Sequence, residues 1–331
     1  MKLYGLITLL FFVQFSFAQG KAEQGNKSVH AFWFQVNDLV KTEIKLESNE
    51  VGNPKLYTSH LQTDVCSDGL CKPINITIEW NLLGHFHGYK TDQKHVLTKF
   101  DHVELTAEDH KKLHQILSDT ASILRDYKVE DMIDTTSFVR SLKIDAVTGA
   151  TSKTFDGVTV EGALYTVYTL WHFINGDVRK NILNHTRSLL SDSFVQYMLK
   201  SDDRDQISFI LANITDLQRQ AFLPEIIKLV SHPDDYIPHF ALAQLTDKTL
   251  SNYSNQHLLL GYIPNVAPHL QNAILDRLKN VKLDNKGLAS LINSMPGLKA
   301  TQMNKAFTII ENNKTALNKK LLKEIENLPK K

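Results

Sequence analysis

The periodicity of the sequence changes near residues 176–188, and this change favours a fold made of two parts. Before it, strand patterns dominate. Residues 74–80 (INITIEW) alternate strictly between apolar and polar side chains, as in a strand with one buried face. After it, amphipathic segments of about 10–15 residues follow one another. The sequence therefore predicts an α+β domain at residues 19–180 and an all-α domain at residues 181–331.

The N-terminal part also contains signals for element boundaries. Residues 81–84 predict a turn, and residues 85–89 (HFHGY) predict the return strand. Thr106 begins a predicted helix, because Asp109 three residues later completes an approximate capping box. Apolar residues at helical spacing extend this predicted helix as far as Leu124.

The C-terminal part shows a second, longer period. Prolines recur at Pro233, at Pro264 or Pro268, and at Pro296, a spacing of about 30–35 residues that is typical of repeat proteins. This period predicts an α-solenoid of the HEAT or tetratricopeptide type, with an irregular helical bundle as the alternative. The lysine-rich end, NKKLLKEIENLPKK, is typical of a solvated terminal helix.

The first residues have the pattern of a secretory signal peptide. Lys2 precedes an apolar run that ends near Val13, and Ser16 and Ala18 are the small residues that a signal peptidase recognises. The run is shorter than the ~18–20 apolar residues that span a bilayer. We therefore expect residues 1–18 to be removed, and the mature protein to be secreted or periplasmic and not membrane-spanning.

The charge balance argues against one class of partner. The chain has 37 Lys and Arg residues against 36 Asp and Glu residues, so it lacks the basic surplus of proteins that bind nucleic acids. No nucleic-acid partner is predicted.

Two cysteines, Cys66 and Cys71, are the only ones in the chain. In an oxidising compartment, so close a pair is most simply a disulfide, and Gly69 between them can take the positive φ of a turn. A redox-active pair is the alternative, although the spacing differs from the C-x-x-C pattern of thioredoxin-like centres.

Histidines suggest a metal site as a further alternative. His85 and His87 alternate on the predicted return strand and would share one side with Tyr89, where they could join the two cysteines around zinc. An oxidised cysteine pair would not bind zinc tightly, so no metal ligand is predicted. His110 and His114 have the four-residue spacing of helical ligands, but no glutamate lies between them as in H-E-x-x-H. A solvated helix face is predicted for them.

The most informative motif is IDAVTGATSKT at residues 144–154. It lies between the strand-rich segment and a predicted helix, whose apolar stripe runs from Ala163 to Ile174 and which should stop at Gly176. The motif resembles the covalent flavinylation motif, Asp-x-x-Ser/Thr-Gly-Ala-Thr-Ser/Thr, of the FMN-binding domain in peripheral subunits of sodium-pumping quinone reductases and Rnf electron-transport complexes. The matching residues are Asp145, Thr148, Gly149, Ala150, Thr151 and Ser152.

The resemblance implies that Thr151 carries FMN through a phosphoester bond made by an extracytoplasmic flavin transferase. Gly149 and Ala150 have almost no side chain, so the flavin donor and the transferase could approach the backbone closely. Ser152 could donate a hydrogen bond to the phosphate, and Asp145 could serve recognition by the transferase. N–H groups at the start of the following helix would also favour a phosphate.

The resemblance is confined to residues 143–175, and the family's glycine-rich opening and Glu-Thr-Pro-Gly segment are absent. Aromatic residues follow the motif, and one of them could stack on the flavin, although their helical spacing is more typical of a core. These residues are Tyr165, Tyr168, Trp171 and Phe173.

Two functional hypotheses follow. The first is an extracytoplasmic flavoprotein that exchanges electrons with a redox protein. It would act as a carrier, because no catalytic acid or base can be named from the sequence. The alternative is a cofactor-free secreted protein whose helical repeats bind another protein.

Overall fold

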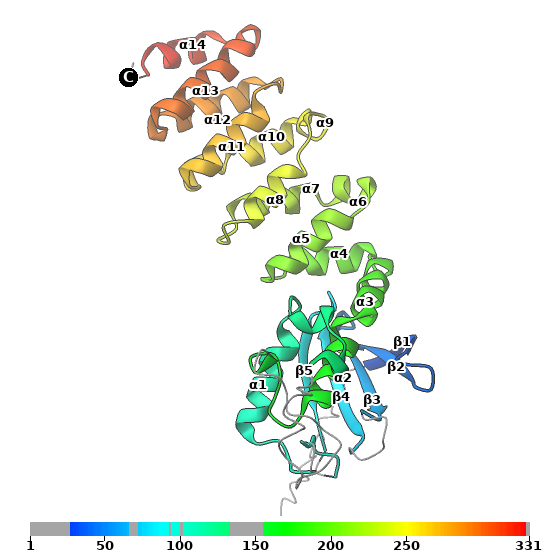
Figure 1. Ribbon diagram of the computed structural model, residues 1–331. Helices are drawn as coiled ribbons and strands as arrows, with labels where there is room; N and C mark the ends of the chain where they lie inside the picture. The colour runs from blue at the N-terminus through cyan, green and yellow to red at the C-terminus, as the bar shows by residue number, and fades with distance from the viewer. Residues whose placement is uncertain (1–26, 66–71, 93, 100–101, 133–154, 329–331) are drawn as a thin grey trace, which may run out of the picture.

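The computed structural model describes residues 27–65, 72–92, 94–99, 102–132 and 155–328. In this part of the chain, a five-stranded antiparallel sheet is followed by a mostly helical region that contains α2 to α14 (Figure 1). The predicted order, a strand-rich part and then a helical part, is confirmed.

The sheet has its strands in sequence order, each antiparallel to the next. Its core face comes from regular alternation: Ile74, Ile76, Ile78 and Trp80 are each at most 1% exposed, as the sequence predicts. The strands are β1 (Lys27–Gln35), β2 (Lys41–Ser48), β3 (Pro54–Thr63), β4 (Ile74–Asn81) and β5 (Phe86–Lys90).

The predicted turn between β4 and β5 is also confirmed. The Asn81 side chain accepts hydrogen bonds from the backbone N–H groups of Leu83 (3.0 Å) and His85 (2.9 Å). Gly84 takes a φ of +74°, and a Cβ atom there would lie 2.9 Å from the Arg179 carbonyl oxygen. The turn therefore requires glycine both for its backbone conformation and for the close approach of the following helices.

The return strand β5 differs from the prediction. The ladder between β4 and β5 shifts register beside Trp80, which leaves His87 without a partner directly opposite. Phe86 and Tyr89 consequently lie together, with ring centroids 6.4 Å apart, while His87 is exposed. The expected shared side of His85, His87 and Tyr89 is therefore wrong, because it assumes a strand without a bulge.

Helix α1 (Ala107–Ser118) begins where the sequence predicts. The Thr106 hydroxyl accepts from the Asp109 N–H group, and the Asp109 carboxylate accepts from the Thr106 N–H group. The helix ends at Ser118, six residues earlier than its apolar pattern predicts, with extended backbone at Asp119. Leu124 is still fully buried, but from a separate 3₁₀ turn, Ile123–Asp126.

Helix α2 (Leu164–Asn175) covers the core face of the sheet. The Trp80 indole N–H donates to the Ile174 carbonyl oxygen (3.1 Å), and the Phe173 ring packs against the Trp80 ring at 5.7 Å. The helix is also bonded to the end of α1, because the Trp171 indole N–H donates to the Asp119 carbonyl oxygen (2.9 Å). The helix stops at Gly176, as predicted.

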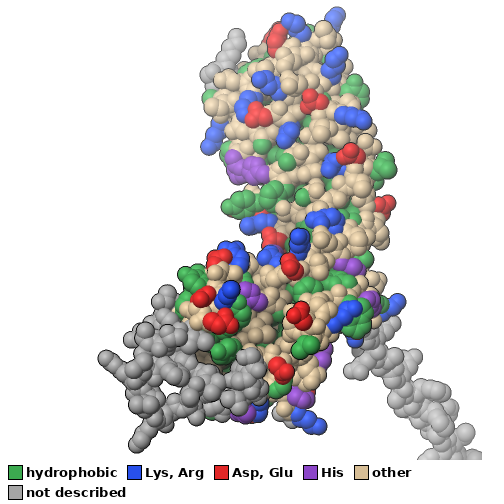
Figure 2. Space-filling model, turned by 45° about the vertical axis from the view of Figure 1, so that its right-hand side comes forward, with side chains coloured by type: hydrophobic (Ala, Val, Ile, Leu, Met, Phe, Trp, Pro, Cys, Tyr) green, Lys and Arg blue, Asp and Glu red, His purple; other side chains and the backbone are tan. Residues whose placement is uncertain are grey.

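The remaining helices stack in sequence away from the sheet, and the C-terminus lies at the far end of the molecule (Figure 1). On the face of the stack seen in Figure 2, acidic and basic side chains are interspersed. They are α3 (Asp177–Ser188), α4 (Asp192–Met198), α5 (Arg204–Asn213), α6 (Asp216–Ala221), α7 (Leu223–Lys228), α8 (Ile237–Ala243), α9 (Asp247–Leu250), α10 (Tyr253–Leu260), α11 (Pro268–Leu278), α12 (Asn285–Ser294), α13 (Ala300–Asn312) and α14 (Lys319–Glu326).

These helices form two alternating series. Helices α5, α8, α11 and α13 contact one another in succession, and so do α7, α10, α12 and α14. The first series begins at Arg204, Ile237, Pro268 and Ala300, at intervals of 33, 31 and 32 residues. Each helix therefore packs on one that lies about one such interval earlier in the sequence.

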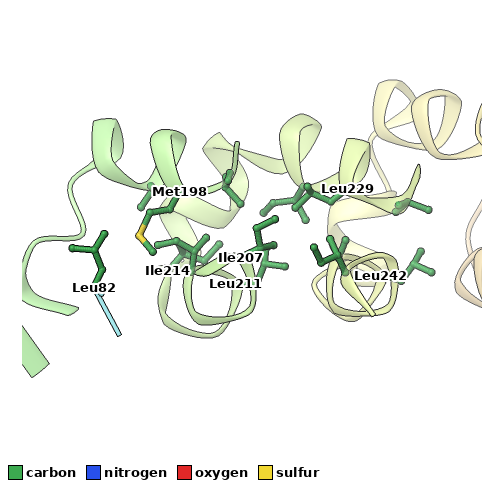
Figure 3. Packing of buried hydrophobic residues seen from close by; sticks show 14 of the residues in the cluster. Leu82, Met198, Ile207, Leu211, Ile214, Leu229 and Leu242 are labelled. Atoms are coloured by element: carbon green, nitrogen blue, oxygen red, sulfur yellow. The ribbon is translucent and has the colours of Figure 1, made fainter. Parts of the chain in front are cut away.

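Helix α3 joins the stack to the sheet through three directed hydrogen bonds. The Thr186 hydroxyl donates to the Leu82 carbonyl oxygen (2.6 Å), so it accepts from the Tyr57 hydroxyl (2.9 Å). The Tyr57 oxygen can then accept from Nδ1 of His185 (2.9 Å), which places a proton on that nitrogen. Apolar packing continues across this junction: Figure 3 shows Leu82 of the β4–β5 turn at one end of a row of buried side chains that extends to Leu242.

Candidate functional site

The residues predicted to form the flavin site lie outside the described part of the chain. They are Asp145, Thr148, Gly149, Ala150, Thr151 and Ser152. The predicted disulfide, Cys66 with Cys71, and the predicted signal peptide, residues 1–18, also lie outside it. The described chain resumes at Phe155, four residues after Thr151, so the structure shows where the motif is attached to the fold.

The attachment point is well fixed. Phe155 is 5% exposed, and its ring meets the Tyr127 ring edge-on at 5.1 Å. The Val158 N–H group and the Thr159 hydroxyl both donate to the Phe155 carbonyl oxygen, at 2.9 and 3.0 Å. Lys112 of α1 donates to the Asp156 carbonyl oxygen at 2.7 Å. The chain after the motif is therefore held against α1 and the segment that follows α1.

Helix α2 begins at Leu164, thirteen positions after Thr151 in the sequence, and not directly after the motif. Its N-cap residue is Ala163, and no side chain caps it. The crevice beside it has a volume of 20 Å³, room for about one water molecule. Lys99, which lines this crevice, is already paired with Asp109 at 2.9 Å. This crevice is therefore too small to hold a phosphate.

The aromatic residues after the motif divide into two groups. Trp171 and Phe173 belong to the core, at 2% and 5% exposure, so they are not available to stack on a flavin. Tyr165 and Tyr168 are half-buried. Tyr168 lies 4.2 Å from the ring of His172, and its pKa is raised, first by burial and then by nearby carboxylates.

The imidazole of His172 is fixed on its other side. Its Nε2 lies 3.0 Å from the Leu124 carbonyl oxygen, and burial lowers its pKa. Helix α2 therefore carries a phenol and an imidazole side by side, both half-buried.

A separate hollow of 660 Å³ lies between β5 and α1. It is lined by Gly88, Tyr89, Thr91, His110, Lys111, His114 and Gln115. The Tyr89 hydroxyl lies 2.6 Å from Nδ1 of His110, and burial raises the pKa of Tyr89 to about 12. Of the two histidines predicted on a solvated helix face, His114 is exposed, whereas His110 is half-buried against Tyr89.

Sequence reasoning missed this hollow because Tyr89 and His110 lie on different elements. The only signal was the four-residue spacing of His110 and His114, which an exposed helix face explains equally well. The β5 bulge turns Tyr89 toward α1, and a bulge of this kind has no marker in the sequence.

Further features limit the chemistry of the described residues. Within them, no group of three or more His, Cys, Asp or Glu side chains could hold a metal ion. None of the helices in the same residues combines the length and apolarity needed to cross a bilayer. The chain matches no protein-family model, no curated protein and no solved structure. Any functional assignment therefore depends on the residues of this chain itself.

Proposed function

We propose that this protein is an extracytoplasmic flavoprotein that carries FMN covalently on Thr151 and exchanges electrons with a redox protein. The observation that carries the proposal is the sequence Asp145-Ala-Val-Thr148-Gly-Ala-Thr151-Ser, which has the residue types of a flavinylation motif at every constrained position. A flavin transferase in the same compartment would attach the cofactor, after removal of residues 1–18.

The anchored chain after the motif supports this proposal. Phe155 lies four positions after Thr151, and four residues span at most about 14 Å when fully extended. A phosphoester on Thr151 would therefore stay near Phe155, which is held beside Tyr127 and α1. Outside the cytoplasm, a covalent bond also prevents loss of FMN by dilution.

The protein and the cofactor would have separate roles. FMN would supply the electron chemistry, and the chain would bind and position it. The hydroxyl of Ser152 would donate a hydrogen bond to the phosphate, while Asp145 and Thr148 would belong to the pattern that the transferase recognises. The fixed ends at Phe155 and α2 would hold the attachment point against the sheet part of the molecule.

Intact mass is the test of this proposal. The full chain, with its signal peptide, is expressed together with a flavin transferase. We expect the mature protein to gain the mass of FMN less one water and to give a fluorescent band on a denaturing gel. Thr151→Val should abolish both signals, whereas the control Thr154→Val should keep them. An unmodified mass for the wild-type chain in the presence of an active transferase would overturn the proposal.

A second candidate function is a protein-binding helical repeat, and the regular stacking favours it. Pro233, Pro264 and Pro296 each lie four residues before a helix of the first series, so the proline period of the sequence coincides with the helix period. Side-chain bonds also link neighbouring periods, such as Arg204 with Asp234 (2.6 Å). We propose that α4 to α14 form a solenoid of the HEAT or tetratricopeptide type.

Deletion of one period tests the repeat. Removal of residues 268–299 should leave a shorter stack in which α13 packs on α8, because the units of a solenoid contact only their neighbours. Circular dichroism and size-exclusion chromatography should report a folded, monodisperse protein. If the deletion unfolds the helical region, that region is instead an irregular bundle.

A further inference from the structure

The hollow between β5 and α1 brings together two imidazoles from one face of a helix. His110 and His114 are four residues apart on α1, so their Cβ atoms lie about 5–6 Å from each other. Both line the hollow, and its 660 Å³ leaves room for several water molecules beside them. Their spacing allows one nitrogen of each ring to reach the same ion at about 2.0–2.1 Å.

The contacts of the two rings leave the same nitrogen available on each. The Tyr89 hydroxyl lies at Nδ1 of His110 (2.6 Å), which leaves Nε2 as the coordinating atom. Nδ1 of His114 lies 3.5 Å from the Ser118 hydroxyl, and the Phe86 ring packs against this imidazole at 5.2 Å. Histidines that bind metals usually have such a partner on the nitrogen that faces away from the metal.

The helix that carries the two imidazoles is itself firmly held. Its N-terminus has a complete capping box, and the Asp109 carboxylate of that box is also paired with Lys99 at 2.9 Å. Leu113 and Leu117, on the adjacent face of the helix, are fully buried against the core. A site on so rigid an element needs little ordering when an ion binds.

We infer that His110 and His114 form a two-imidazole site for a divalent transition-metal ion, with Tyr89 as the residue that positions His110. Water would complete the coordination, because none of the described residues that line the hollow is a carboxylate. Neutral imidazole nitrogens suit copper, nickel and zinc, and the general order of stabilities places Cu²⁺ first. Lys111, the charged residue at the rim, opposes the cation and keeps the affinity moderate.

Calorimetric titration of the full mature chain with Cu²⁺ and with Zn²⁺ tests this site. We expect one equivalent to bind, with Cu²⁺ tighter than Zn²⁺. His110→Ala or His114→Ala should each remove that equivalent. The matched control is the double variant His239→Ala, His269→Ala, which removes an exposed pair of stacked imidazoles (5.5 Å) on α8 and α11 and should leave the titration unchanged.

The variant Tyr89→Phe tests whether Tyr89 positions His110 for the metal ion or only supports the fold. It should lower the Cu²⁺ affinity by roughly 10-fold or more, while the circular dichroism spectrum stays that of the wild type. Electron paramagnetic resonance of the wild-type Cu²⁺ complex should show two coordinating imidazole nitrogens, and either single-histidine variant should lose this signature. The inference is overturned if no equivalent binds, if binding survives the loss of both His110 and His114, or if the control pair accounts for it.

Discussion

The sheet part of the molecule, β1 to α2, and the helical part, α3 to α14, are held together over very different sequence distances. In the sheet part, Trp80 bonds Ile174, 94 residues away. In the helical part, side-chain bonds between helices typically span about one helix period. Asn313, for example, accepts from the N–H group of Leu283, 30 residues earlier.

This difference predicts two kinds of unfolding. The contacts of the sheet part close long loops and therefore form or break together. The helical part is stabilised mainly between neighbours along the sequence, so its far end can open without the rest. The hydrogen bond between Tyr57 and Thr186 links the sheet part to the helical part, because Thr186 belongs to α3, the first helix of the stack.

Loss of the central indole should show the cooperative behaviour most clearly. Trp80 is fully buried, so Trp80→Ala should cost about 3–5 kcal/mol of unfolding free energy and destabilise the whole sheet part. Urea denaturation followed by circular dichroism measures this change. Trp33→Ala is the control, since Trp33 is 55% exposed and should change stability by at most about 0.5 kcal/mol. Equal effects in the two variants would contradict the assignment of the core.

A core truncation in the helical part should have a smaller and more local effect. Ile274 of α11 is fully buried, so Ile274→Ala should cost about 2–4 kcal/mol. Hydrogen exchange should become faster in α10 to α14 and stay unchanged in the sheet. Leu322→Ala, at a position 46% exposed on α14, provides the control. If exchange in the sheet accelerates equally, the two parts unfold as one unit.

The sequence predicted the elements whose pattern is local. The alternation of β4, the capping box of Thr106 and Asp109, and the stop of α2 at Gly176 each depend on residues close in the chain. The end of α1 could not be predicted in this way. The apolar spacing continues through Leu124, but the backbone becomes extended at Asp119, whose carbonyl oxygen accepts from Trp171.

The two candidate sites also differ in whether their residues are close together in the sequence. The residues around Thr151 that resemble a flavinylation motif are contiguous, so the sequence alone suggests them. The pairing of Tyr89 with His110 depends on a register shift in β5 and on the packing of α1, and neither has a sequence marker. The spacing of His110 and His114 is the one sequence signal for this site, and it is equally compatible with an exposed helix face.

The smallest expected effect is the change in stability with acid pH. One carboxylate in each part of the molecule, Asp109 and Asp234, should contribute to it. A hydrogen bond from Lys99 is the main cause that lowers the pKa of Asp109 to about 2, and one from Arg204 does the same for Asp234. Because both values lie below the ordinary 3.8, each ionised group stabilises the folded state above about pH 4. That contribution should be lost as the pH falls from about 4 to about 2.

The variants Asp109→Asn and Asp234→Asn should therefore be less stable than the wild type at pH 6, and the difference should shrink toward pH 2. Both carboxylates are partly exposed, so added salt should also reduce this difference in part. Asp109→Asn should lower the midpoint of global unfolding, because α1 packs on the sheet part. Asp234→Asn should mainly accelerate hydrogen exchange in α5 and α8. The ion pair of Asp234 with Arg204 links the N-terminal ends of these two helices. A difference that stays constant from pH 6 to pH 2 would show that neither carboxylate acts through its charge.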